Sequence, residues 1–338
     1  MKEIFWISVF KAATFRKTIN SLKVITSLFL SKILKQNFVW GTPFIINIEP
    51  TVVCNLKCPQ CITGMGKIKR DSSFLSYKLY KQILDELGNN LWYLLLYNQG
   101  EPFLHKEFIE LIELAKQKRI YVTTSTNGHF FEREVAVERL VKSGLDSIII
   151  SLDGADENTY QKYRHNGDFK KVIKGIKLLA YCKKKLKSKT PKILIQFLVM
   201  KHNEQQLVKI KRLIKKLGAD RLLIKTFQIE DKNKALSFLP SNKKINRYKN
   251  GTKKLNLKNS ASKGCARLWY STVILSDGRV VPCCFDKNGE YSFGKIKDKS
   301  LKEIWTSDEY KNFRSQISRN RGFFEICRNC TQNQKIFF

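Results

Sequence analysis

Acidic residues are scarce in this sequence: 29 Asp and Glu accompany 63 Lys and Arg in 338 residues, which gives a formal net charge of +34. Such an excess can indicate a nucleic-acid or anionic-membrane partner. However, the basic residues are spread along the chain, and no arginine-rich arm with interleaved aromatic residues is present. A biased coding composition accounts for this pattern more simply, so we do not expect nucleic acid to be a partner.

Cysteine is too rare for a disulfide scaffold, and its distribution is uneven. Of nine cysteines, three lie at 54–61, five lie at 265–330, and Cys182 stands alone. Cysteines separated by two or three residues are typical of metal ligation in a reducing compartment rather than of disulfide pairing. We therefore expect a cytoplasmic protein.

Long uninterrupted apolar runs are absent, and we find no convincing secretory signal. Basic residues interrupt the apolar stretch from 5 to 34, which excludes a standard membrane-spanning helix, and no small-residue cleavage site follows it. Residues 1–41 are instead expected to form an amphipathic helical segment. It could rest peripherally on the anionic inner face of a membrane, or it could pack on the domain that follows. Its apolar face contains Phe15, Ile19, Leu22, Ile25, Phe29 and Ile33, and its polar face contains Arg16, Asn20, Lys23, Ser27 and Ser31.

From residue 42 onward, short apolar runs alternate with amphipathic stretches. The expected strands are 44–49, 92–97, 120–126, 147–152, 192–199 and 221–226, and the expected helices are 76–88, 105–118, 131–142, 168–187 and 203–217. Such alternation predicts an α/β fold of βα units with a parallel sheet, either open or closed into a partial barrel. Residues 42–230 would form this domain, 231–263 a flexible basic linker, and 264–338 a second, smaller domain.

Polar motifs follow four of the expected strands. "CNLKCPQC" follows the first, "NQGEP" the second, "STNG" closes the third and "SLDG" closes the fourth. The carboxyl ends of parallel strands are where sheets and barrels of this kind build their sites. The repetition is what indicates a site, because each short motif alone would be weak evidence.

The first motif contains Cys54, Cys58 and Cys61 in the spacing C-x3-C-x2-C, without a fourth cysteine nearby. Three thiolates can hold three irons of a [4Fe–4S] cube and leave the fourth iron open to a cofactor or substrate. A structural zinc site would need a fourth protein ligand, and the nearest histidine, His105, is far along the chain. The pattern therefore favours an iron–sulfur cluster with an open position.

A C-x3-C-x2-C run directly after the first strand of a βα repeat resembles the radical S-adenosylmethionine (SAM) enzymes. The resemblance extends from about residue 42 onward and implies a partial (β/α)6 TIM-type barrel. It implies that the open iron chelates SAM, which is cleaved to a 5′-deoxyadenosyl radical with an electron from a reductant such as flavodoxin or ferredoxin.

The resemblance also implies a set of cofactor contacts. Cys54, Cys58 and Cys61 would hold the cluster, and the loop after the second strand would hold the SAM ammonium group. Two departures from the family pattern are Gln99, where a glycine is usual, and Gln60, where an aromatic residue is common. The implied SAM contacts are Gly100, Glu101, Ser125, Asn127, Ser151, Asp153 and Arg164.

The C-terminal region contains Cys265, then a predicted β-hairpin turning at Asp277-Gly278 and ending at Cys283, and later a C-x2-C pair. This order resembles the SPASM/twitch extension of radical SAM enzymes. The resemblance implies a small α+β domain with an auxiliary [4Fe–4S] cluster, although structural zinc remains an alternative. The implied ligands are Cys265, Cys283, Cys327 and Cys330; Cys284 and Cys182 are expected to serve in packing.

A fully ligated auxiliary cluster can accept an electron from a substrate radical, so the sequence favours a radical SAM oxidoreductase that performs a dehydrogenation. The substrate could be a small molecule, a glycan or a peptide, and a peptide-modifying maturase is the alternative enzyme. A non-catalytic, metal-stabilised RNA- or membrane-binding protein is the alternative of another class. No base is identified among the polar residues near the strand ends: His105, Tyr163, His165, Gln196, Lys225 and Gln228.

Overall fold

The computed structural model describes residues 12–71, 74–249, 256–258 and 262–330. They form two compact units, each assembled from separate stretches of chain. The first consists of the described parts of Met1–Val53, Lys69–Thr123 and Ser262–Cys327, and the second of those of Cys54–Ile68, Thr124–Ala261 and Arg328–Phe338. C-terminal residues therefore belong to the same unit as the first strands of the chain.

The first unit is built on a mostly parallel set of strands. β1 (Ile45–Ile48) lies between β2 (Tyr93–Leu95) and β7 (Ser271–Ile274) and is parallel to both. β2 also pairs in parallel with β3 (Tyr121–Thr126), and β7 pairs in antiparallel fashion with β8 (Val280–Val281). The β7–β8 turn contains Gly278 at φ +81°, which confirms the predicted hairpin. The hairpin therefore extends the sheet that β1 begins.

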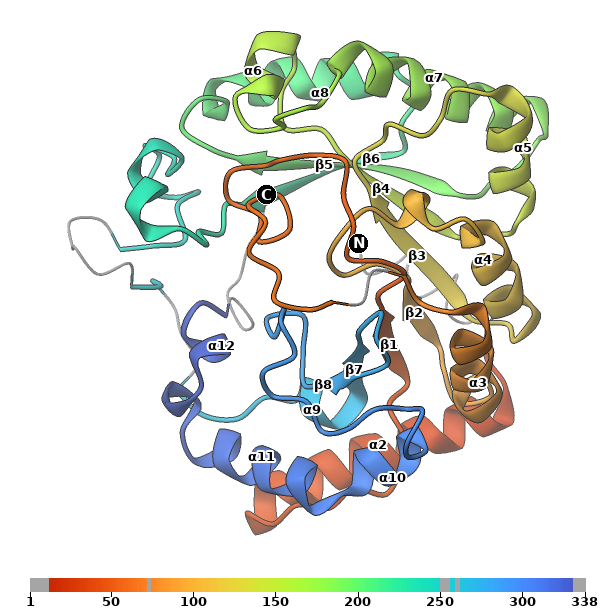
Figure 1. The fold of residues 1–338 in the computed structure, drawn as a ribbon, viewed down its shortest axis with the longest axis vertical. Coiled ribbons are helices and arrows are strands. Elements are labelled where there is room, and N and C mark those ends of the chain that lie inside the picture. Colours follow the sequence, from red (N-terminus) through yellow and green to blue (C-terminus); the bar gives the residue numbers. More distant parts are fainter. Residues whose placement is uncertain (1–11, 72–73, 250–255, 259–261, 331–338) are drawn as a thin grey trace. The chain divides into compact units, whose positions relative to one another are not determined.

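Helices of the first unit come from both ends of the chain, and Figure 1 shows α2, α10 and α11 beside one another. The stretch "SLKEIWTSDEYKNFRSQI" forms two helices, because Ser307 ends one and caps the next by accepting from the Tyr310 N–H. The helical elements are α2 (Phe15–Leu34), α3 (Tyr77–Leu87), η1 (Pro102–Leu104), α4 (Phe108–Gln117), α9 (Arg267–Tyr270), α10 (Leu301–Thr306), α11 (Asp308–Arg319), η4 (Arg321–Phe323) and α12 (Glu325–Arg328), whose last residue belongs to the second unit.

The second unit contains β4 (Ser147–Ser151), β5 (Lys192–Val199) and β6 (Arg221–Thr226), paired in parallel in that order. Helices lie outside these strands (Figure 1). The six strands of the predicted βα repeat, β1 to β6, all fall within their expected ranges, which confirms the alternation read from the sequence. The helical elements of this unit are α5 (Glu134–Lys142), α6 (Glu157–Gln161), α7 (Phe169–Lys185), η2 (Glu204–Gln206), α8 (Leu207–Lys216) and η3 (Lys232–Ser237).

Part of the stretch 231–263, which the sequence predicts to be a linker, contains buried residues. Tyr248 and Leu257 are buried and pack in one apolar cluster with Leu56 and Cys58. The Tyr248 hydroxyl accepts from the Ile229 N–H at 3.0 Å and donates to Asn329 at 2.8 Å. The few apolar residues of this basic stretch therefore pack in the core, which its overall composition did not indicate.

Helix α2 packs on the first unit with its polar side. Its buried residues are Lys17, Asn20, Val24, Ser27 and Ser31. Lys17 Nζ donates to the carbonyls of Arg119 and Lys118, at 2.7 and 3.3 Å, just beyond the end of α4. Burial, followed by the charges of Lys116 and Arg119, lowers the pKa of Lys17 to about 8. A cation at the carboxyl end of a helix satisfies carbonyls that have no helical partner.

We expect Lys17 to make the protein more stable as the pH rises from about 8 to about 10.5. Its folded-state pKa lies below the unfolded one, so the unfolded chain binds more protons in this window. The free energy of unfolding, measured with urea under anaerobic conditions, should rise more for wild type than for Lys17→Met over this pH range. The same difference for Lys78→Met, at an exposed position on α3, should stay constant. A constant Lys17→Met difference would contradict the prediction.

Candidate active site

In the first unit, the loop after β2 packs tightly on the segment that leads into the first cysteines. Gly100 has φ +71°, and a Cβ there would lie 2.4 Å from the Thr51 carbonyl oxygen and 2.8 Å from that of Val53. The Glu101 N–H donates to the Val53 carbonyl at 2.8 Å, and Val53 directly precedes Cys54. Only glycine fits both this backbone conformation and this close approach.

Glu101 is buried at 1% exposure. Its Oε1 accepts from the Phe103 N–H at 3.2 Å, so the carboxylate caps the short helix η1. This contact fixes the direction of the side chain. An anion held in this way can bind a cationic group such as an ammonium.

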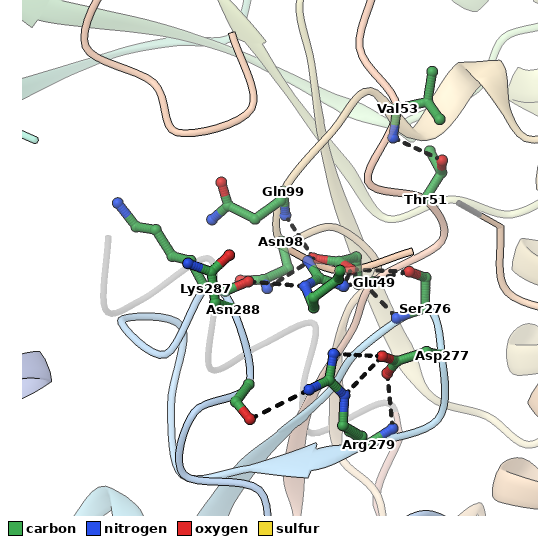
Figure 2. Close-up of polar contacts among 12 residues, drawn as sticks. Glu49, Thr51, Val53, Asn98, Gln99, Ser276, Asp277, Arg279, Lys287 and Asn288 are labelled. Atoms are coloured by element: carbon green, nitrogen blue, oxygen red, sulfur yellow. Dashed lines mark hydrogen bonds and ion pairs between the residues drawn. The ribbon is translucent and has the colours of Figure 1, made fainter. Parts of the chain in front are cut away.

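Glu49, at the end of β1, anchors the same loop. Its buried carboxylate forms a bidentate ion pair with Arg70, with Nη1–Oε1 at 2.6 Å and Nη2–Oε2 at 3.0 Å. It also accepts from the Asn98 side chain at 3.0 Å and the Gln99 N–H at 3.2 Å (Figure 2). Gln99, the departure from the family's glycine, is thus fixed through its backbone rather than its side chain.

The same carboxylate reaches the C-terminal hairpin. Glu49 Oε1 accepts from the Ser276 hydroxyl at 3.1 Å and from its N–H at 3.3 Å, and Arg70 Nε donates to the Lys287 carbonyl at 2.9 Å (Figure 2). The hairpin turn is closed by Arg279, whose guanidinium pairs with Asp277 at 2.7 Å. One buried ion pair therefore joins the loop after β2 to the region of the second cysteine group.

The first cysteine cluster lies in the second unit, where N–H groups point at two of its sulfur atoms. The Leu56 N–H donates to Cys54 Sγ at 3.4 Å, Asn127 Nδ2 lies 4.0 Å from the same atom, and Arg164 Nη1 lies 3.9 Å from Cys58 Sγ. N–H donors around sulfur stabilise thiolates and tune the potential of an iron–sulfur cluster. The donor set therefore fits a cluster.

A histidine sets the orientation of the Asn127 amide. His129 Nε2 accepts from the Asp168 N–H at 2.9 Å, so the ring proton is on Nδ1, which donates to Asn127 Oδ1 at 2.9 Å. The amide nitrogen is thereby directed towards Asn55 Oδ1, at 2.7 Å, and Cys54. Burial, and then the charge of Lys171, lowers the pKa of His129, which keeps the ring neutral.

Arg164 is held by Asp153, another predicted SAM contact. Asp153 Oδ2 accepts from Arg164 Nε at 2.7 Å and lies 2.6 Å from Nη2, while Oδ1 accepts from the Leu198 N–H at 2.8 Å. Burial lowers the pKa of Arg164, but Asp153 and Cys58 outweigh it and raise the pKa well above its usual value. Both Asp153 oxygens are thus engaged, and its contact is with Arg164; the predicted contacts of both residues with SAM stay predictions.

Burial raises the pKa of the Cys58 thiol to about 11, against the influence of Arg164. Ionisation of this thiol therefore needs the positive charge of a bound metal, as is usual for thiolate ligands. Among the described side chains, no three Cys, His, Asp or Glu form a group that could hold a metal ion.

Gln60, whose role the sequence did not indicate, clamps the cysteine loop to the loop after β6. Its Oε1 accepts from the N–H groups of Glu230 and Asp231 at 2.9 and 2.8 Å, and its Nε2 donates to the Asp231 carbonyl at 3.1 Å. The Lys57 N–H also donates to the His165 carbonyl at 3.0 Å. The only sequence signal for this role was the unusual polar residue before the third cysteine.

The contacts of the remaining predicted site residues do not assign them a role in catalysis or SAM binding. Ser125 lies in β3 and is half-buried, and Ser151 ends β4 and is buried. His105 is buried in the first unit, with one ring nitrogen at 2.7 Å from the Leu75 carbonyl and the other accepting from the Glu107 N–H at 3.2 Å. Gln228 donates to Glu230. His105 is therefore structural, and none of these residues is identified as a base.

In the first unit, Cys265, Cys283 and Cys284 lie close enough to Arg267 to influence its pKa. Burial lowers the pKa of Arg267, but these three cysteines, with Cys284 first, and Tyr270 raise it overall. Cys265 and Cys327 pack against one apolar cluster, and Cys284 packs against Val273, Leu275 and Val281 as expected for a packing role. Cys330 is buried and belongs to the second unit. The four-cysteine ligand set stays a prediction.

Two parts of the chain match known families. Residues 48–214 match the Radical SAM superfamily, and residues 265–331 match SPASM, an iron-sulfur cluster-binding domain. This chain belongs to the radical SAM superfamily. The two domains imply a SAM-binding [4Fe–4S] cluster, an auxiliary iron–sulfur cluster and SAM as the cofactors of this radical SAM protein.

Relatives of this radical SAM protein have several named activities. The tungsten-containing aldehyde ferredoxin oxidoreductase cofactor-modifying protein of Pyrococcus furiosus is 26% identical over 313 residues, 84% of this chain and 86% of that protein. Mycofactocin maturase MftC of Mycobacterium tuberculosis is 34% identical over 138 residues, 41% of this chain and 34% of that protein. The crystal structure of Streptococcus suis SuiB bound to S-adenosylmethionine matches with a TM-score of 0.60 at 18% identity, over 89% of this chain and 75% of that chain. This likeness confirms the predicted fold, a partial TIM-type barrel with a C-terminal extension.

Replacing Gly100 by alanine should weaken SAM binding by more than about tenfold, which corresponds to about 1.4 kcal/mol. The added Cβ would collide with the Thr51 carbonyl oxygen at 2.4 Å and displace the loop that carries Glu101. Equilibrium dialysis of the anaerobic holoprotein against labelled SAM measures the change.

Gly218→Ala is the matched control for this variant. Gly218 has φ +72°, close to that of Gly100, but its Cβ would meet only Ala180 Cβ, at 3.1 Å. It therefore introduces the same backbone strain without the collision and should leave SAM affinity unchanged. Equal losses of affinity in the two variants would show that the close approach of the Gly100 loop is irrelevant to SAM binding.

Proposed function

We propose that the protein is a radical SAM oxidoreductase: it cleaves SAM reductively and uses the 5′-deoxyadenosyl radical to abstract a hydrogen from its substrate in a net dehydrogenation. The observation that carries the proposal is the surroundings of the first cysteine cluster, where N–H donors from Leu56, Asn127 and Arg164 point at its sulfur atoms. The bound cluster and SAM supply the radical chemistry. The chain binds, orients and shields them.

Each predicted SAM contact has a distinct task in this proposal. Glu101 binds the SAM ammonium with its fixed carboxylate, and Gly100 permits the close backbone approach that places it. Ser125, Asn127 and Ser151 provide neutral donors and acceptors to the ribose and methionine groups. Arg164, oriented by Asp153, places a permanent positive charge beside Cys58.

The second cysteine group would hold the auxiliary cluster that takes the electron from the substrate radical. In this scheme one substrate hydrogen goes to the 5′-deoxyadenosyl radical, one electron goes to the auxiliary cluster and one proton goes to a base. The substrate is thereby oxidised by two electrons. An external reductant such as flavodoxin or ferredoxin supplies the separate electron for SAM cleavage. The set Cys265, Cys283, Cys327 and Cys330 is the proposed ligand set.

A maturase that modifies a peptide or a cofactor is the second candidate function. It is favoured by the Pyrococcus furiosus relative, which is named a cofactor-modifying protein and aligns over 84% of this chain. The same SAM site would serve this activity. The two candidates differ in substrate rather than in the radical step.

Cys58→Ala should abolish 5′-deoxyadenosine formation and lower the iron content from about eight to about four per chain, because only the first cluster is lost. Anaerobic reconstitution, iron analysis and chromatography after incubation with SAM and dithionite measure both effects. Cys182→Ala, on α7, is the matched control and should change neither. Continued 5′-deoxyadenosine formation in Cys58→Ala with its first cluster lost would contradict the proposal, as would a wild-type protein that contains zinc and no iron.

Cys283→Ala should lose the auxiliary cluster but keep the cleavage of SAM, since the two cysteine groups serve different steps. We expect about four irons per chain and 5′-deoxyadenosine formation within about threefold of wild type, a difference of under 1 kcal/mol in barrier. Cys284→Ala tests the neighbouring residue and should retain both clusters. A Cys284→Ala variant that loses the auxiliary cluster while Cys283→Ala keeps it would reassign the ligand.

A further inference from the structure

Helix α2 faces the protein with the side that periodicity would assign to solvent. Its buried residues are mostly polar, and its most exposed large residues are apolar. An amphipathic helix of a globular protein normally does the reverse. Either the exposed apolar side binds another partner, or the helix would lower its free energy by rotating about its axis to bury that side.

Turning is prevented by specific hydrogen bonds along the buried side. Asn20 exchanges two bonds with the Thr42 backbone, at 2.9 and 3.0 Å, and the Trp92 indole donates to the Lys17 carbonyl at 3.1 Å. Ser31 Oγ accepts from the Phe38 N–H at 2.9 Å and from the Trp269 indole at 3.3 Å. Rolling the helix would leave these buried groups without partners, at a cost of about 1–3 kcal/mol each. The rotation of α2 is therefore fixed by its polar side.

The opposite side presents a continuous apolar stripe to solvent. Leu22, Ile25, Phe29 and Ile33 recur at helical spacing with exposures of 59, 55, 61 and 56%, and Phe15 at the start of the helix is 81% exposed. A contiguous exposed apolar surface of this kind marks a binding face rather than ordinary surface residues.

The charged residues of α2, the helix that carries the α2 stripe (Phe15, Leu22, Ile25, Phe29 and Ile33), are all positive. Residues 15–34 contain Arg16, Lys17, Lys23 and Lys32 and no Asp or Glu. At 100° per residue, Lys23 and Lys32 fall on opposite flanks of the stripe, and both are exposed. An apolar stripe between cationic flanks is complementary to a surface that is apolar inside and anionic outside.

We propose that α2 docks the protein on an anionic lipid bilayer, with the stripe at the boundary between headgroups and acyl chains and its lysines among the headgroups. An amphipathic helix such as α2 attaches to the surface of a bilayer. No helix among the described residues is long and apolar enough to cross a membrane. A second copy of the chain is the poorer occupant, because two acid-free α2 helices would place their cationic flanks against one another. This docking surface is independent of the SAM site and goes beyond the proposed activity.

Co-sedimentation of the full-length, anaerobically reconstituted protein with phosphatidylglycerol/phosphatidylcholine vesicles tests the proposal. We expect binding to these vesicles and at least about tenfold weaker binding to pure phosphatidylcholine, because each Lys or Arg near an anionic surface contributes about 1 kcal/mol. Ile25→Asn with Phe29→Asn should weaken binding by more than about tenfold, since two apolar side chains leave the lipid.

The control variant is Val135→Asn with Val208→Asn. These residues are also apolar and are exposed at 77 and 61% on α5 and α8, outside the stripe, so vesicle binding should not change. The role of charge is tested by the double variant Lys23→Glu with Lys32→Glu. Its control is Lys78→Glu with Lys174→Glu, which reverses the charge of two exposed lysines on other helices. Only the first pair should release the protein from the vesicles, and iron content should stay the same in all four variants.

Two results would overturn the proposal. One is binding to anionic vesicles that is unchanged by both α2 variants, which would place the lipid contact elsewhere. The other is a wild-type protein that does not bind vesicles and sediments as a dimer, while Ile25→Asn with Phe29→Asn sediments as a monomer. That result would make a second copy of the chain the occupant of the stripe. Neither result would affect the proposed activity, because 5′-deoxyadenosine formation is measured without lipid.

Discussion

The Glu49–Arg70 ion pair is the constraint on which the first unit depends. Both side chains are 0% exposed, and the Glu49 carboxylate accepts from Arg70, Asn98, Gln99 and Ser276. A buried carboxylate with fewer partners would be strongly destabilising, so these contacts must form together. Because they come from the loop after β2 and the β7–β8 hairpin, the pair fixes the positions of these two elements.

The second unit uses neutral amides and one charged pair to hold its cysteine loop. Asn127 contacts it from the end of β3, and Gln60 ties it to the loop after β6. Arg164, aligned by Asp153, approaches Cys58. The loop itself contains little regular structure, so these side chains provide its rigidity. Preorganised contacts of this type keep a metal-binding loop in place before its cofactor arrives.

The sequence predicted the strands and the motif positions well, because both depend on local patterns. β4, β5 and β6 each contain three consecutive apolar residues, and cysteine spacing is visible without a structure. The rotation of α2 was not predictable: periodicity identifies its two faces, but contacts such as that of Lys17 with Arg119, 102 residues away, decide which face is buried. The partners of Glu49 and Gln60 were missed for the same reason. Hydrogen bonds between distant segments have no local signature, and the buried Tyr248 was hidden in a basic stretch.

The separation of Glu49 from its partner Ser276, 227 residues along the chain, has a consequence for biosynthesis. Translation proceeds from the N-terminus, so β1 emerges from the ribosome long before the hairpin that completes its contacts. During that interval Glu49 lacks its contacts with Ser276, and β1 has a free edge where β7 will later pair in parallel. The first unit therefore cannot reach its final structure until the β7–β8 hairpin, and with it most of the polypeptide, has been synthesised.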